Sequence, residues 1–199
     1  EPFERIARAR LPEAGSAHRM LLETPVTARQ YNLDGYVFRG ELRELGIVES
    51  VMYPGTQAFM RFIHPCALPA DGRSKALDVA RRFLAAAGFT HGLFNMEFFY
   101  DAATDKLTVI EFNPRMAAQF SDLYLRVDGI DLHRAALELA HGRDPALLPR
   151  AGATAGVAAS FVYRSFDPAA RPPVPTAAQQ RALARRFPDA MLFCFPKGA

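Results

Sequence analysis

The chain has 199 residues, of which 50% are hydrophobic and 23% are charged, so it can bury a substantial core and does not belong to the disordered class. It has no apolar run near the ~18 residues of a membrane-spanning helix, and its two cysteines are too few for a disulfide framework. The net charge of +3 comes without a compact lysine and arginine block, which disfavours nucleic acid as a partner. We therefore expect a soluble, cytoplasmic protein that binds neither nucleic acid nor membrane.

The first half of the chain alternates β-patterned and helical stretches. The predicted elements are a short helical pattern in residues 1–17, a strand that ends at Pro25, a hairpin of strands 29–38 and 42–50, a loop with an irregular strand in residues 51–70, and a helix in residues 73–87. This helix has an apolar face, and Gly88 is its predicted stop. Two further strands flank a polar turn centred near Thr104.

The second half begins with a predicted helix from Leu132 to His141, which follows the potential cap Asp131. The next predicted elements are a strand in residues 157–164, a helix in residues 176–187 and a strand in residues 190–195. The composition changes after about Arg143. We therefore expect a main unit at residues 1–143 and a smaller extension at residues 144–199.

The stretch NMEFFYDAATDKLTVIEFNPR, residues 95–115, predicts a hairpin that brings two glutamates together. Symmetric pairing about its turn makes Glu97 the partner of Glu111, with Cβ atoms ~4.5–5.5 Å apart. Alternation adds Asn95 and Asn113 to the same face of the sheet. The opposite face is expected to pack into the core, through Phe94, Met96, Phe98, Ile110 and Phe112.

Two carboxylates this close disfavour joint ionisation, so either one takes up a proton or a cation lies between them. Two glutamate oxygens and an asparagine carbonyl are hard ligands that suit Mg²⁺ or Mn²⁺, which makes Glu97, Glu111 and Asn113 candidate metal ligands. Arg115 lies one step further along the same face, where its fork of donors suits a phosphate or a carboxylate. The alternative is a register shifted by one residue, with solvated glutamates on opposite faces.

The strings NMEF and IEFNPR, together with the upstream LLETPVTARQYNLDGY, resemble the large C-terminal lobe of the ATP-grasp superfamily. The resemblance implies an α+β fold, with a mostly antiparallel sheet flanked by helices, and the cofactors ATP and Mg²⁺ (or Mn²⁺). It further implies that Glu97, Glu111 and Asn113 bind the metal that bridges the ATP phosphates. Arg115 is the implied catalytic residue, in contact with phosphate or with the acid substrate.

The same resemblance places an adenine hinge upstream of the first predicted hairpin. Glu23 and Thr24 would begin this hinge, and Val26 would present its backbone N–H to adenine. The residue seven positions after Glu23 would hold the ribose hydroxyls. Members of the family have an acidic residue there, whereas this chain has Gln30, which can bond to a hydroxyl but carries no charge.

The resemblance implies an ATP-dependent and Mg²⁺-dependent ligase, which joins a small-molecule carboxylate to an amine or a similar nucleophile through an acyl phosphate. The smaller lobe of such enzymes supplies lysines and a Gly-rich loop, but the first lysine here is Lys75 and no such loop precedes it. We therefore expect the C-terminal part of a longer enzyme, inactive alone. The alternative is a non-catalytic nucleotide-binding or regulatory module. Residues 144–199 either complete the lobe or form a homodimer contact.

Overall fold

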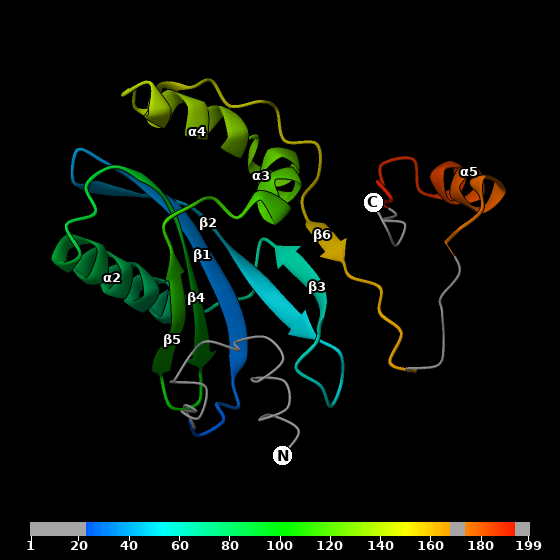
Figure 1. Cartoon of the computed structure of the whole chain (residues 1–199), viewed down its shortest axis with the longest axis horizontal. Coiled ribbons are helices and arrows are strands. Elements are labelled where there is room, and N and C mark those ends of the chain that lie inside the picture. Colours follow the sequence, from blue (N-terminus) through cyan, green and yellow to red (C-terminus); the bar gives the residue numbers. More distant parts are fainter. Residues whose placement is uncertain (1–22, 168–173, 194–199) are drawn as a thin grey trace, which may run out of the picture. The chain divides into compact units, whose positions relative to one another are not determined.

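The computed structural model describes residues 23–167 and 174–193, which belong to two compact units that divide after Ser160. The first unit is built on a sheet with the strand order β5-β4-β1-β2-β3-β6 (Figure 1). The strands are β1 (Arg29–Phe38), β2 (Glu41–Met52), β3 (Phe59–His64), β4 (Gly92–Asp101), β5 (Lys106–Asn113) and β6 (Ala158–Phe161). The pairs β1–β2, β1–β4, β2–β3 and β4–β5 are antiparallel. The expected α+β fold with a mostly antiparallel sheet is therefore confirmed.

Helices flank this sheet. They are α2 (Ala70–Ala86), α3 (Ser121–Asp128) and α4 (Leu132–Ala140), with short 3₁₀ turns at Ala118–Phe120 and Pro145–Leu147. The cap predicted for α4 is present, because the Asp131 side chain accepts hydrogen bonds from the backbone N–H groups of His133 and Arg134. The sequence did not predict α3, which ends at Gly129 in the left-handed conformation. None of the helices in the described residues has the length and apolarity to cross a bilayer.

The two faces of β1 differ in character, and this difference positions the site. Tyr31 and Leu33 belong to the main core cluster, which α2 covers with buried Ala76, Ala80 and Leu84 (Figure 1). The alternate residues of β1 are Gln30, Asn32 and Asp34, and they are also buried. Because successive side chains of a strand point to opposite faces, the middle of the sheet has an apolar side under α2 and a polar side opposite it, and beyond these polar residues Tyr36 and Leu93 pack with Leu139 of α4.

The connector after Arg143 is part of the first unit up to Ser160, and hydrogen bonds hold it there. The Tyr36 hydroxyl donates to Asp144 Oδ1 at 3.0 Å, and the Ala151 N–H donates to the Gly129 carbonyl oxygen at 3.0 Å. The second unit, considered separately, contains α5 (Ala177–Arg186), at the place where the sequence predicts a helix. Thr176 and Gln179 form a reciprocal capping box at its start.

Three predictions concern the ends of the chain. The helical pattern in residues 1–17 lies outside the described residues. The strand predicted to end at Pro25 lies partly outside them, and its described residues, 23–25, have no regular structure. Of the strand predicted in residues 190–195, the described part, residues 190–193, likewise has no regular structure. Among the described residues, β1 is the first strand of the sheet.

Candidate functional site

At the two glutamates, the register of the β4–β5 hairpin is the one predicted from symmetric pairing. Glu97 lies opposite Glu111, and Asn95 lies opposite Asn113. The alternative register, which would place the two glutamates on opposite faces, is wrong. Glu97 is half-buried and Glu111 is exposed, so the pair lies where the polar face of the sheet opens to solvent.

A β-bulge lies between this acidic pair, Glu97 and Glu111, and the turn. Pairing resumes with Phe98 opposite Val109, so Ile110 is an additional residue in β5. The expectation that Ile110 packs into the core is wrong, because this residue is 43% exposed. The turn also differs slightly from the prediction. Asp101 pairs with Lys106, so the turn is centred between Ala103 and Thr104 and not on Thr104. The bulge offsets this displacement and restores the predicted register at the acidic pair.

Each member of the acidic pair accepts a hydrogen bond from a neutral amide. Gln30 on β1 donates from Nε2 to Glu97 Oε2 at 3.1 Å. Asn113 donates from Nδ2 to Glu111 Oε1 at 2.7 Å. A hydrogen bond to a carboxylate favours its charged form, so the bond from Gln30 opposes part of the rise in the pKa of Glu97.

The electrostatics of the pair favour a cation. Burial raises the pKa of Glu97, and the negative charge of Glu111 raises this pKa further, whereas Arg115 and the hydrogen bond from Gln30 lower it. A divalent ion between the carboxylates would remove their repulsion. Within residues 23–167 and 174–193, no three His, Cys, Asp or Glu side chains gather in a way that could hold a metal ion. A cation here would rely on two carboxylates and the Asn113 carbonyl, which fits Mg²⁺ because this ion commonly takes one or two carboxylates with substrate phosphates.

Arg115 follows the end of β5 and is exposed. Its guanidinium donates to the carbonyl oxygen of the adjacent Met116 at 3.3 Å. The positive charge lowers the pKa of both Glu97 and Asp34, so Arg115 acts electrostatically on the polar face. The structure therefore brings Glu97, Glu111, Asn113 and Arg115 to one region.

The predicted hinge precedes β1. Glu23, Thr24 and Val26 are exposed in a segment without regular structure. Gln30, by contrast, is 6% exposed and contacts Glu97 directly. Of the four predicted nucleotide-binding residues, Gln30 is therefore the one whose contact with the acidic pair is visible, and the roles of the other three stay predictions.

Sequence reasoning missed Asp34 and its partners on the polar face. This carboxyl is 2% exposed, and it accepts hydrogen bonds from Tyr124 and Asn95. Burial raises the pKa of Asp34 to about 7, although both hydrogen bonds lower it. The available signal was the polar series Gln30, Asn32 and Asp34 at alternate positions of a strand whose other residues are apolar.

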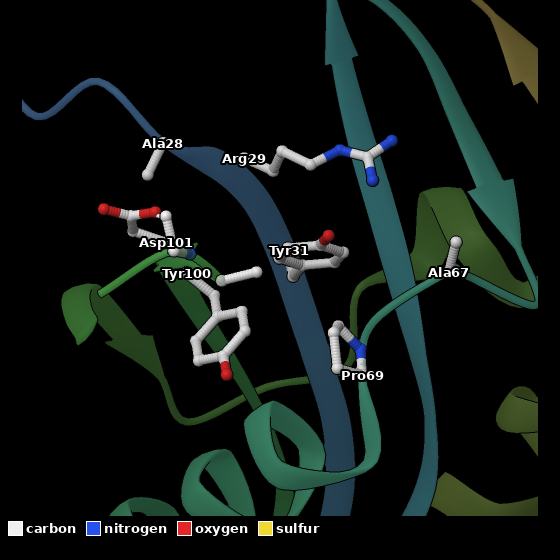
Figure 2. Close-up of a pocket in the computed structure, with 9 residues that line it drawn as sticks. Ala28, Arg29, Tyr31, Ala67, Pro69, Tyr100 and Asp101 are labelled. Atoms are coloured by element: carbon white, nitrogen blue, oxygen red, sulfur yellow. Dashed lines mark hydrogen bonds between the residues drawn. The ribbon is translucent and has the colours of Figure 1, made fainter. Parts of the chain in front are cut away.

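A separate shallow pocket of about 300 Å³ lies at the start of β1. Figure 2 shows Arg29, Tyr31, Tyr100 and Asp101 around this hollow. Tyr31 and Tyr100 belong to the core cluster under α2, so the pocket opens on the side of the sheet opposite Gln30 and the acidic pair. It contains none of the predicted site residues.

No family model matches the chain. A known protein is similar to it in sequence, and several solved structures are similar to it in fold. Carnosine synthase 1 of Gallus gallus is 32% identical over 142 residues, which cover 68% of this chain and 15% of that protein. The chain therefore spans less than a fifth of the length of this curated relative.

Two solved structures share the fold. The L-amino acid ligase of Bacillus licheniformis has a TM-score of 0.51 and 17% identity, and the match covers 57% of this chain and 29% of the ligase. The biotin carboxylase of Campylobacter jejuni, in complex with β,γ-ATP, has a TM-score of 0.52 and 19% identity, and the match covers 68% of this chain and 28% of the carboxylase. At these identities the similarity concerns the fold.

Proposed function

The chain belongs to the ATP-grasp superfamily, and we propose that it is the C-terminal lobe of an ATP-dependent carboxylate ligase. The observation that carries this proposal is the pairing of Glu97 with Glu111 on an open polar face, with Asn113 bonded to Glu111. Because the chain matches 15% of the length of the chicken relative, we place the smaller lobe of such an enzyme outside these residues.

Glu97, Glu111 and Asn113 would hold Mg²⁺ or Mn²⁺ through two carboxylates and one amide carbonyl. When bound, such an ion neutralises phosphate oxygens of ATP and stabilises the charge that develops during phosphoryl transfer. The raised pKa of Glu97, caused by burial and then by the charge of Glu111, supports this assignment. An ion at this position would convert the repulsion into a stabilising interaction.

The proposed reaction has two steps. A carboxylate oxygen of the acid attacks the γ-phosphorus of ATP, the bond from this phosphorus to the β,γ-bridging oxygen breaks, and ADP leaves. An amine then attacks the carbonyl carbon of the acyl phosphate, inorganic phosphate departs, and the amine loses a proton. The chain binds and orients the reactants, and Arg115 would contact the transferring phosphoryl group or the acid carboxylate through its planar fork of donors.

Nucleotide binding is assigned to the hinge that leads into β1. Glu23 and Thr24 would begin this hinge. The backbone N–H of Val26 would donate a hydrogen bond to adenine, and Gln30 would form hydrogen bonds with the ribose hydroxyls. The hydrogen bond from Gln30 to Glu97 supports this arrangement, because it links the ribose end of the hinge to the acidic pair. The same side chain would then serve both the nucleotide and the cation ligand.

The substrates are proposed from the names of similar proteins. Both a carnosine synthase and an L-amino acid ligase match this chain, which favours an amino acid or a similar small acid as carboxylate and an amino group as nucleophile. We also propose that the first part of the extension, residues 144–160, completes the lobe. The hydrogen bonds from Tyr36 to Asp144 and from Ala151 to Gly129 support that assignment.

The test is Mg²⁺-dependent ADP formation by the intact protein with a panel of amino acids as acids and amines. Glu111→Gln keeps the size of the side chain but removes its charge, and it should lower the rate on the order of 100-fold. Glu41→Gln is the matched control, because Glu41 is an exposed residue of β2 that pairs with Phe38, at the opposite end of β1 from Gln30. A wild-type rate for Glu111→Gln, or no ADP from the wild type with any pair, would contradict the proposal.

A second candidate function is a nucleotide-binding module without turnover. The observation that favours it is Gln30, which stands where the family has an acidic residue and is already bonded to Glu97. Calorimetry with ATP and Mg²⁺ separates the two functions. Nucleotide binding without ADP release, in the presence of all acid and amine pairs, would favour the module.

A further inference from the structure

A continuous series of hydrogen bonds lies behind the acidic pair. Tyr124 donates from its hydroxyl to Asp34 Oδ2 at 2.7 Å, and Asn95 donates from Nδ2 to Asp34 Oδ1 at 3.1 Å. Asn113 Nδ2 lies 3.5 Å from Asn95 Oδ1 and 2.7 Å from Glu111 Oε1, with both oxygens as acceptors. This relay crosses from α3 through β1 and β4 to β5.

The relay has a direction because each amide has one donor end and one acceptor end. An ionised Asp34 can only accept, so Asn95 turns its NH₂ group toward Asp34 and its carbonyl oxygen toward β5. That oxygen and the Glu111 carboxylate are both acceptors, so Asn113 turns its NH₂ group toward them. The carbonyl oxygen of Asn113, which is the atom that could bind a cation, therefore points away from the Asn95 oxygen to which its NH₂ group donates.

Asp34 is a costly residue at its position. It is 2% exposed, and burial of a carboxylate is unfavourable unless the group is well hydrogen-bonded. Its two partners are the neutral donors Tyr124 and Asn95, and neither cancels the negative charge that Asp34 carries above about pH 7. The need for a side chain that accepts hydrogen bonds from both Tyr124 and Asn95 would account for a carboxylate here. An amide or a hydroxyl at this position would bring a donor of its own.

We propose that Asp34 is a positioning residue of the cation site, which acts through Asn95 to orient the carbonyl oxygen of Asn113. The inference rests on the proposed function, because it takes Asn113 as a cation ligand together with Glu97 and Glu111. Asp34 itself contacts neither the cation nor a substrate. Partners behind the ligands of a metal typically change metal affinity 10-fold to 100-fold when they are replaced.

Asp34→Asn tests the relay with a nearly isosteric change. The Tyr124 hydroxyl donates, so the new carbonyl takes this bond and the new NH₂ group faces Asn95. The Asn95 amide then flips, so that its NH₂ group faces the NH₂ group of Asn113. Asn113 loses one of its two acceptors, and its orientation is no longer fixed. Asn95→Leu breaks the relay at its next link and serves as the second variant.

The readout is the affinity for Mn²⁺ in the presence of ADP, measured on the intact protein from the electron paramagnetic resonance signal of free Mn²⁺. Asp34→Asn and Asn95→Leu should each raise the Mn²⁺ dissociation constant about 10-fold. Ser50→Ala is the matched control, because it removes the acceptor of buried Asn32, 2.8 Å away on the same face, without touching the relay. It should leave Mn²⁺ affinity unchanged.

A double-mutant cycle tests whether Asp34 acts through Asn113. In the Asn113→Ala background, Asp34→Asn should cause no further loss of Mn²⁺ affinity. An equal loss in both backgrounds, or wild-type affinity in Asp34→Asn or Asn95→Leu, would overturn the relay while leaving the proposed function intact. If the wild-type protein itself binds no Mn²⁺ in the presence of ADP, the proposed cation site fails, and the relay fails with it.

Discussion

At the scale of single residues, Gln30 and Asn113 determine how much charge the site carries. Both donate to the acidic pair, at 3.1 Å to Glu97 and at 2.7 Å to Glu111, and neither brings a charge. Neither amide therefore cancels the charge of a carboxylate, which leaves the pair suited to a cation. An acidic residue in place of Gln30 would bring a third carboxylate against Glu97, and like charges at this distance oppose ionisation.

The buried carboxyl of Asp34 makes stability depend on pH. Burial raises its pKa to about 7 in the folded state, against a usual value of ~3.9 in an unfolded chain. Between these values the folded state binds a proton that the unfolded state has released, so the free energy of unfolding falls as pH rises from about 4 to about 7. Above pH 7 this loss is complete, at roughly 4 kcal/mol from this group.

Asp34→Asn removes the titrating group, so the difference in unfolding free energy between this variant and the wild type should change by several kcal/mol between about pH 4 and pH 7, in favour of the variant at high pH. Urea denaturation at a series of pH values measures this difference. A difference that does not vary with pH would contradict the raised pKa. Ser50→Ala, which lacks a titrating group, should show no such trend.

At the scale of elements, β1 is the central support of the site. It pairs with β2 on one side and with β4 on the other, and its register shifts against β2 between Asp34 and Gly35. Gly35 permits a close approach there, because an added Cβ would lie 2.7 Å from the Arg43 carbonyl oxygen and 2.7 Å from Phe94 Cζ. The strand can thus carry a buried carboxyl and a tight packing contact at successive positions.

Gly35→Ala should destabilise the protein by about 1–3 kcal/mol, because the backbone of β2 and the Phe94 ring must both move. Gly152→Ala is the matched control, since an added Cβ at that position meets nothing within 4 Å. The measurement is the midpoint of urea denaturation for both variants. Equal midpoints would contradict the prediction, because they would show that the residues around Gly35 move to accommodate a methyl group without a loss of stability.

Local patterns predicted most of these elements, for identifiable reasons. The helix at α4 has a side-chain cap in Asp131, and the hairpin at β4–β5 has a polar turn between apolar strands. The bulge at Ile110 and the helix α3 were not predicted. A bulge depends on how the edge strand twists against its neighbour, and an eight-residue helix such as α3 is stabilised by packing more than by its own sequence.

The candidate site shows the same division. The pairing of Glu97 with Glu111 was predicted correctly from a turn position and alternation, although the structure reaches it through two departures that offset each other, a turn centred between residues 103 and 104 and the bulge at Ile110. The contact of Gln30 with Glu97 and the relay from Asp34 could not be predicted, because they depend on how β1 pairs with β4, across 67 and 61 residues of sequence. Contacts at such separations follow from the assembled sheet and not from a local pattern.

At the scale of the whole molecule, one face of the sheet contributes to the core and the other carries the candidate site. The face under α2 holds the core cluster, and the polar face holds Glu97, Glu111 and the relay from Asp34. If Glu97 and Glu111 act as proposed, the sheet would hold them rigidly, which favours accurate positioning of phosphates. This arrangement agrees with membership in a superfamily of ligases and with a chain that spans only part of its relative.

The measurement that tests the central claim most directly follows oxygen from the acid substrate to phosphate. The intact protein is incubated with ATP, Mg²⁺, an amine and an amino acid labelled with ¹⁸O in its carboxylate, and the inorganic phosphate is analysed by ³¹P nuclear magnetic resonance. An acyl phosphate predicts that one ¹⁸O atom from each acid consumed appears in phosphate. Phosphate without the label, or the formation of AMP in place of ADP, would contradict a ligase that acts through an acyl phosphate.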